Sequence, residues 1–296
     1  KLGNWLSSER ETLARRCRNF GMDEEEVGKV TEGIRKGFDS ELRFLSDESN
    51  IGQMRGKLGE LVSDGKVGGE VRAVVKSRME EVSPVGVLEL IDKKLSGDVS
   101  REDEMLLNCL LWAKGGSLGV AHADSLSGTI NLELLGRGGM ADYGSVLAHE
   151  FTHLGLMRVA GGADMVEAAV EMNKESDERN SAQKLFMQAR KAINESMAHL
   201  SENFAGGEVR EPIYSQYRDK IDPRLFKQFF DLLKENLPKD DMDKFDRRCK
   251  ELYLSFWQGV GSIKSTEDVR GSVTRFIAET RSKQFGNKTG KEQGED

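Results

Sequence analysis

The stretch Val146-Leu-Ala-His-Glu-Phe-Thr-His-Leu-Gly-Leu156 decides how the chain is interpreted. Apolar residues flank its centre and no proline interrupts it, which is typical of an α-helix. Residues four apart lie on one face of a helix, so His149 and His153 can bind the same ion, and Glu150 can reach a water molecule on it. The chain has only 4 histidines, and two at this spacing around a glutamate predict a zinc site. The alternative is an ordinary amphipathic helix with two histidines.

The residues before the motif predict two short strands, at 117–123 and 128–135, because apolar and polar side chains alternate in the second of them. Residues 124–128 are typical of a hairpin connection. The glycine-rich residues 136–139 separate the second strand from the motif helix, and Gly161-Gly162 predict the end of that helix.

This order of strand, glycine turn and HExxH helix resembles the zincin metallopeptidases, over about residues 117–205. The resemblance implies a zinc-dependent endopeptidase. It also implies an α+β fold that is predominantly helical: a zincin-like catalytic unit with a small β-hairpin or sheet, and extra flanking helices. The longer metzincin motif requires a glycine and a third histidine where this chain has Leu156 and Val159, so that subclass is excluded.

A catalytic zinc site needs three protein ligands and an open position. The segment Asn194–His199 is similar to the second helix of the gluzincins, and this resemblance implies Glu195 as the third ligand. Those families have an aspartate where this chain has His199, which could hold a zinc-bound imidazole, bind the metal, or stabilise the transition state. Glu195 lies near the polar border of an amphipathic helix, so a solvated glutamate is the alternative. The other candidates for third ligand are Asp164, Glu167, Glu171, His199 and His122.

The chemistry implied is hydrolysis of a protein or peptide substrate. Zinc lowers the pKa of its bound water to about 7, and Glu150 would act as the general base. Zincins commonly use a further side chain to stabilise the oxyanion, and the candidates here are Tyr217, Tyr214, Arg218 and His199. The first choices for catalysis are Glu150, Tyr217 and His199.

Two other classes of function remain open at this stage. In one, the protein is a metal-stabilised binding module without turnover. Glu150 argues against this reading, because a purely structural metal site has no use for a general base. In the other, the zinc site hydrolyses something other than a peptide.

Composition excludes several kinds of partner. The net charge of −7 and the lack of a basic run argue against nucleic-acid binding. No apolar run approaches the ~20 residues of a membrane span. There is no signal peptide, although the chain begins at Lys1 and a leader could have been removed. Cys17, Cys109 and Cys249 form no disulfide framework and predict reduced thiols, which favours the cytoplasm.

Almost all residues outside 117–135 predict helices. The expected organisation is a helical region at 1–113, a zincin-like core at 114–205, a second helical region at 206–285 and a disordered tail at 286–296. Serines before Pro84 and Arg101 are typical helix caps. The helices expected outside the core span Asn4–Phe20, Asp23–Phe38, Ile51–Asp64, Val67–Val82, Pro84–Leu95, Arg101–Lys114, Arg224–Asn236, Asp241–Gln258 and Ser265–Phe285.

Overall fold

The computed structural model describes residues 2–65, 67–115, 121–124, 129–132, 134–135, 140–159, 177–205, 223–257 and 265–289. The chain divides into two compact units. The first unit comprises Lys1–Arg15, Asp23–Glu150 and Ala205–Gly207, and the second comprises Arg16–Met22, Phe151–Phe204 and Glu208–Asp296. The helices at Leu2–Phe20 and Met140–Val159 each continue from one unit into the other.

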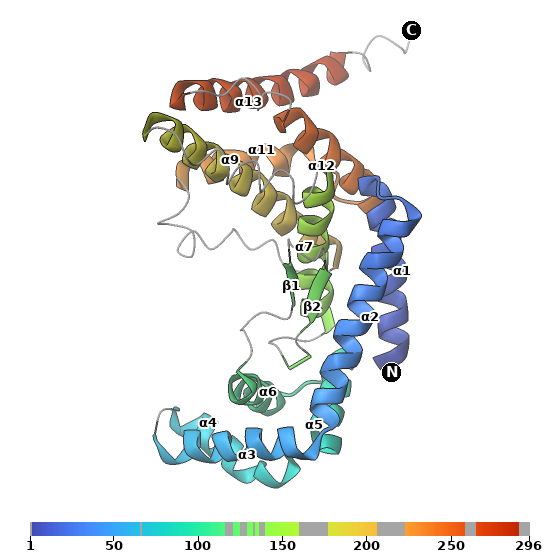
Figure 1. The fold of residues 1–296 in the computed structure, drawn as a ribbon, viewed down its shortest axis with the longest axis vertical. Helices are drawn as coiled ribbons and strands as arrows, with labels where there is room; N and C mark the ends of the chain where they lie inside the picture. Colours follow the sequence, from blue (N-terminus) through green and yellow to red (C-terminus); the bar gives the residue numbers. More distant parts are fainter. Residues whose placement is uncertain are drawn as a thin grey trace. The chain divides into compact units, whose positions relative to one another are not determined.

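Helices dominate the described part of the chain (Figure 1). They account for 87% of it. The fold class is therefore all-helical, and the predicted α+β class is wrong, because the two short strands among the described residues pair only with each other. Strands β1 (Ala121–Asp124) and β2 (Thr129–Leu132) have four residues each and pair antiparallel, with Ala121 opposite Leu132. The alternating pattern predicted longer strands, but after Leu132 the chain turns, with Leu134 and Leu135 both buried. Two strands this short do not form a sheet layer.

Serine and aspartate caps start several helices of the first unit. Asp23 and Glu26 form a capping box at the start of α2, and Ser100 and Asp103 form another at α6. Ser83 accepts a hydrogen bond from the Gly86 amide, with Pro84 in the first helical turn, as the sequence predicted. The helices that lie wholly or partly in this unit are α1 (Leu2–Phe20), α2 (Glu24–Ser46), α3 (Glu48–Ser63), α4 (Gly69–Ser77), the 3₁₀ turn η1 (Met79–Glu81), α5 (Pro84–Ser96), α6 (Arg101–Lys114) and α7 (Met140–Val159).

Helix α2 is longer than the sequence predicted, because its buried stripe continues past Phe38. Leu45 is fully buried, and Glu41, 8% exposed, meets the Lys114 ammonium at 2.6 Å. Strand β2 packs against α2, and Ile130 of this strand is buried. The short hairpin therefore gains its apolar burial from a helix rather than from further strands.

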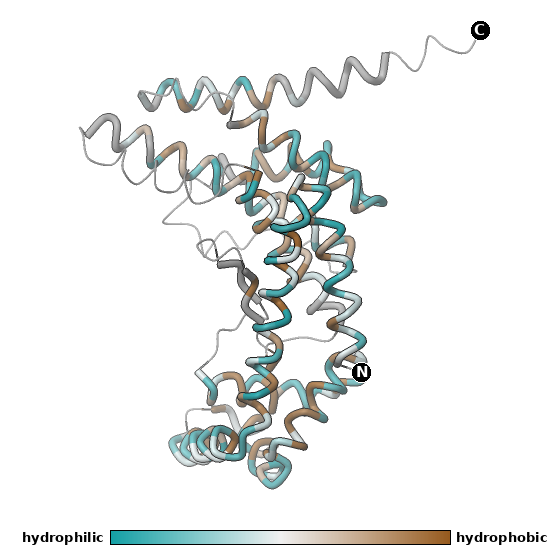
Figure 2. The backbone as a smooth tube through the Cα atoms, turned by 45° about the vertical axis from the view of Figure 1, so that its right-hand side comes forward, coloured by the Kyte–Doolittle hydropathy of each residue, from teal (hydrophilic) through white to brown (hydrophobic). Residues whose placement is uncertain are grey.

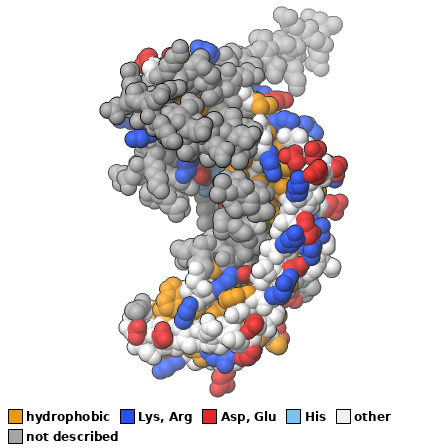
Figure 3. Space-filling model, in the orientation of Figure 1, with side chains coloured by type: hydrophobic (Ala, Val, Ile, Leu, Met, Phe, Trp, Pro, Cys, Tyr) orange, Lys and Arg blue, Asp and Glu red, His pale blue; other side chains and the backbone are white. Residues whose placement is uncertain are grey.

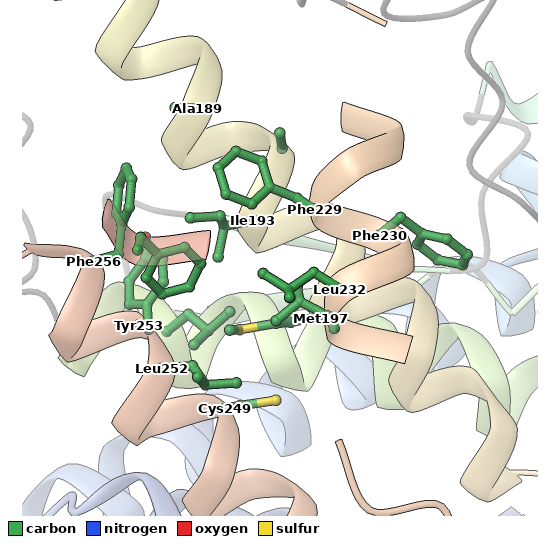
Figure 4. Packing of buried hydrophobic residues seen from close by; sticks show 14 of the residues in the cluster. Ala189, Ile193, Met197, Phe229, Phe230, Leu232, Cys249, Leu252, Tyr253 and Phe256 are labelled. Carbon is green, nitrogen blue, oxygen red and sulfur yellow. The ribbon is translucent and has the colours of Figure 1, made fainter. Parts of the chain in front are cut away.

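The second unit contains α9 and the helices that pack on it. Its elements besides the ends of α1 and α7 are α9 (Asp177–Ser201), the 3₁₀ turn η3 (Glu202–Ala205), α11 (Pro223–Asn236), α12 (Met242–Trp257) and α13 (Thr266–Thr289). Figure 4 shows Ala189, Ile193 and Met197 of α9 facing apolar side chains of α11 and α12. The Phe186 and Phe256 rings stack at a centroid distance of 5.3 Å. Helix α13 includes the first residues of the predicted tail, and residues 290–296 lie outside the described residues.

The described helices carry polar and apolar residues along their lengths (Figure 2). Within the described ranges, no helix combines the length and apolar character that crossing a membrane requires. On the face shown in Figure 3, acidic and basic side chains alternate over the described surface.

A close approach of two helices fixes the second half of α7 in the second unit. Phe20, at the end of α1, is 3% exposed, and its ring lies where a side chain at Gly155 would stand. A Cβ atom at Gly155 would come within 2.3 Å of the ring, a distance that real contacts do not tolerate. Glycine at 155 therefore lets α1 pack against the helix that carries the HExxH motif.

We expect Gly155→Ala to lower the free energy of unfolding by about 1–3 kcal/mol, the usual cost of overpacking a core. Chemical denaturation measures the effect. Gly271→Ala, inside α13 where a Cβ would meet nothing within 4 Å, is the matched control and should be neutral or stabilising by up to about 1 kcal/mol. Equal stability of the two variants would contradict the packing described for Gly155.

Candidate metal centre

The HExxH motif lies on α7, which is one unbroken helix from Met140 to Val159. Phe151 and Leu154 of this helix are buried, whereas His149, Glu150 and His153 are partly buried. The apolar side of the helix thus packs into protein, and the motif lies at the edge of that packing. Because the helix is continuous, its own geometry puts His149 one turn before His153.

Helix α9 brings an amide and a carboxylate to His153. The ring nitrogen Nδ1 of His153 contacts Oδ1 of Asn194, and Nε2 lies 3.7 Å from Oε2 of Glu195. An amide oxygen only accepts hydrogen bonds, so this contact favours the tautomer in which Nδ1 carries the ring proton and Nε2 keeps its lone pair. Metal-binding histidines are commonly held in this way, with one nitrogen on a neighbouring acceptor and the other on the metal.

The distance between Nε2 of His153 and Oε2 of Glu195 is closer to the separation of two ligands of one metal ion than to the length of a hydrogen bond. A separation of 3.7 Å is too long for an N–H···O hydrogen bond. Two ligands of one tetrahedral zinc stand about 3.4 Å apart, given zinc bonds of about 2.0–2.2 Å. Glu195 is only 8% exposed, so it is not the solvated glutamate of the alternative interpretation.

Two groups of side chains among the described residues could hold a metal ion, and they share His149. In the first, the ligand atoms of His149, His153 and Glu195 all lie within 4.8 Å of one another, and in the second the same holds for His149, His199 and Glu202. In the second group, Nδ1 of His199 lies 3.1 Å from Oε1 of Glu202, so these two side chains already contact each other directly. The first group is therefore the better candidate for the metal.

The first group has the composition of a catalytic zinc site. Two imidazoles and one carboxylate are a known ligand set for catalytic zinc, and three protein ligands leave a fourth position open.

The cysteines supply no competing ligand: all three are buried free thiols, as the sequence predicted. Burial and the nearby Asp246 carboxylate raise the pKa of the Cys249 thiol well above its usual value, so this sulfur stays protonated.

A buried ion pair contacts α7 next to the HExxH motif. Arg16 of α1 and Asp246 of α12 are 1% and 0% exposed. Arg16 donates to both carboxylate oxygens, at 3.0 Å from Nε and 2.8 Å from Nη2, and Nη2 also donates to the Thr152 hydroxyl at 2.8 Å. Thr152 directly precedes His153, so three helices meet beside a candidate ligand. Removing one partner of such a buried pair costs about 3–5 kcal/mol.

The structure brings several of the predicted site residues together. His149, Glu150 and His153 lie on α7, and Glu195 lies on α9 with His199 one turn later. The backbone of His122 lies in β1, opposite Asn131. The other predicted candidates lie outside the described residues: Tyr217, Tyr214, Arg218, Asp164, Glu167 and Glu171.

Sequence reasoning missed the contacts of Asn194 and Glu202. Asn194 directly precedes Glu195 in the quoted segment, and its role could have been found from the need of a zinc-bound histidine for an acceptor. Glu202 lies three residues after His199, a spacing that places two helical side chains side by side. Arg16 and Thr152 gave no such signal, because their contact joins residues 136 positions apart.

Comparisons of the chain with protein-family models, with curated proteins and with solved structures found no match. The candidate site is therefore supported by its residues and their geometry alone.

We expect Asn194→Ala to weaken zinc binding by about 10–100-fold, the usual effect of removing a group that orients a metal-bound histidine. Asn194→Asp keeps an acceptor for the Nδ1 proton and should bind zinc nearly as well as the unmodified protein. Competition with a chromogenic chelator gives both affinities. If the folded alanine variant binds zinc normally, Asn194 does not hold a metal ligand.

Proposed function

We propose that the protein is a zinc-dependent endopeptidase in which His149, His153 and Glu195 bind the metal and Glu150 is the general base. The observation that carries this proposal is the arrangement around His153. Asn194 accepts from one ring nitrogen, and the other faces the Glu195 carboxylate at 3.7 Å. A histidine held by an acceptor and directed toward a buried carboxylate has the geometry that a zinc ligand needs.

The reaction follows from the side chains beside that site. Bound zinc supplies a water with a pKa of about 7 and a positive charge for the carbonyl oxygen of the substrate. Glu150 takes a proton from the attacking water and delivers it to the leaving amine. The water oxygen joins the carbonyl carbon as the peptide C–N bond breaks, so the products are a carboxylate and an amine. Tyr217 or His199 would stabilise the oxyanion.

The burial at the site also favours catalysis. Glu150 is partly buried at the edge of a packed helix face, and partial removal from water strengthens electrostatic interactions. The buried Arg16–Asp246 pair carries no net charge, so it can hold Thr152 without a strong field that would oppose a cation. A binding module without turnover would need the same ligands but no base at position 150.

The test of the proposal is Glu150→Gln, which keeps the shape of the side chain but cannot accept the proton. This variant should retain its zinc and lose at least about two orders of magnitude in kcat on a fluorescent casein substrate. Glu89→Gln, at an exposed position on α5, is the control and should cleave at the unmodified rate.

Three outcomes separate the functions under consideration. Cleavage by Glu150→Gln at the normal rate would refute the assignment of the base. Zinc binding without cleavage of casein or a random peptide library would support the metal-stabilised binding module. Protein that binds no zinc would refute both.

A further inference from the structure

The end of α1 contacts α7 on a different face from the one that carries His153. Arg16 donates to the Thr152 hydroxyl at 2.8 Å, and its guanidinium carbon lies 6.0 Å from the centre of the Phe151 ring. Phe151 and His153 are two positions apart on a helix, so their side chains point to nearly opposite sides of it. All four residues belong to the second unit.

Asp246 sets the direction of the N–H group that reaches Thr152. The guanidinium of Arg16 is planar, and its Nε and Nη2 atoms donate to the two carboxylate oxygens at 3.0 and 2.8 Å. Nη2 carries two hydrogens, so one can serve the carboxylate and the other the hydroxyl. The three residues are at most 1% exposed. The Thr152 hydroxyl is therefore held at a defined point of the core.

This hydrogen bond restricts the helical turn that carries His153. On its other side, the His153 ring contacts Asn194, and its Nε2 lies 3.7 Å from the Glu195 carboxylate. A rotation of α7 about its own axis would change that separation, and a metal site needs its ligands placed within about 0.5 Å. The hydroxyl of Thr152, one residue before His153, opposes such a rotation.

We propose that Arg16 and Asp246 are positioning residues for the zinc site, and that they act on His153 through the Thr152 hydroxyl. The proposal rests on the proposed function. It extends the site to helices α1 and α12, which lie outside the residues 117–205 that resemble the zincins. The last turns of α1 are then part of the support of the metal site.

The first test changes only the hydroxyl. Thr152→Val keeps the size of the side chain but accepts no hydrogen bond, and it should weaken zinc binding by about tenfold, as removal of a group that supports a metal ligand does. Thr152→Ser keeps the hydroxyl and should bind zinc nearly as well as the unmodified protein. Competition with a chromogenic chelator for zinc measures both affinities.

The second test separates positioning from stability. Replacing a buried ion pair by apolar side chains of similar volume often leaves stability unchanged, so Arg16→Met combined with Asp246→Leu should give a folded protein. Its zinc affinity should nevertheless fall by about tenfold, because nothing donates to Thr152 from position 16. Adding Thr152→Val to this background should cause little further loss, since the hydrogen bond is already absent.

A second hydrogen bond between α1 and α12 provides the matched control. Nδ2 of Asn19, about one turn after Arg16, donates to Oδ1 of Asp243 at 2.8 Å. Asn19→Ala removes this bond between the same two helices. It should lower stability in chemical denaturation and leave zinc affinity unchanged.

The outcomes distinguish this proposal from the proposed function. Normal zinc affinity in folded Thr152→Val would overturn the positioning role, and so would an equal loss in Asn19→Ala. If Thr152→Val does not fold, normal affinity in the Arg16→Met, Asp246→Leu protein would overturn it instead. In each case the zinc site would stand if the unmodified protein binds zinc. An unmodified protein that binds no zinc would overturn the site and the positioning role together.

Discussion

The buried charge of Arg16 is the constraint on which the motif helix depends. A guanidinium that is 1% exposed is stable in a protein only when it is paired and its N–H groups are hydrogen bonded. Asp246 supplies the charge and two acceptors, and the Thr152 hydroxyl supplies a third. These geometric demands fix α1, α7 and α12 against one another within the second unit. The same contact places the residue before His153, so the requirements of the core and those of the candidate site meet in one network.

The candidate site itself follows from the periodicity of two helices. On α7 a spacing of four residues puts both histidines on one face. On α9 the apolar stripe that includes Ile193 and Met197 packs into the core, and this orientation presents Asn194 and Glu195 to His153. Few special backbone conformations are needed, apart from the close approach that Gly155 allows. A chain with an all-helical fold can therefore assemble a ligand set without the sheet that the resemblance implied.

The sequence predicted the local features well and the long-range ones poorly. The motif helix, the serine caps at Ser83 and Ser100 and most helix positions follow from patterns within a few residues, which determine local structure directly. The error in fold class arose because the alternating residues at 128–135 were taken as part of a sheet, whereas four of them pair with one other strand. The contact of Arg16 with Asp246 spans 230 positions, and no local pattern encodes it. Tyr217 stays a prediction.

The most direct test of the central claim is a crystal structure of the zinc-loaded protein with anomalous data at the zinc edge. We expect one strong peak, about 2.0–2.2 Å from a ring nitrogen of His149, a ring nitrogen of His153 and a carboxylate oxygen of Glu195. A zinc-loaded crystal with no peak at these residues would contradict the account. A peak bound by His199 and Glu202 instead of His153 and Glu195 would contradict it as well.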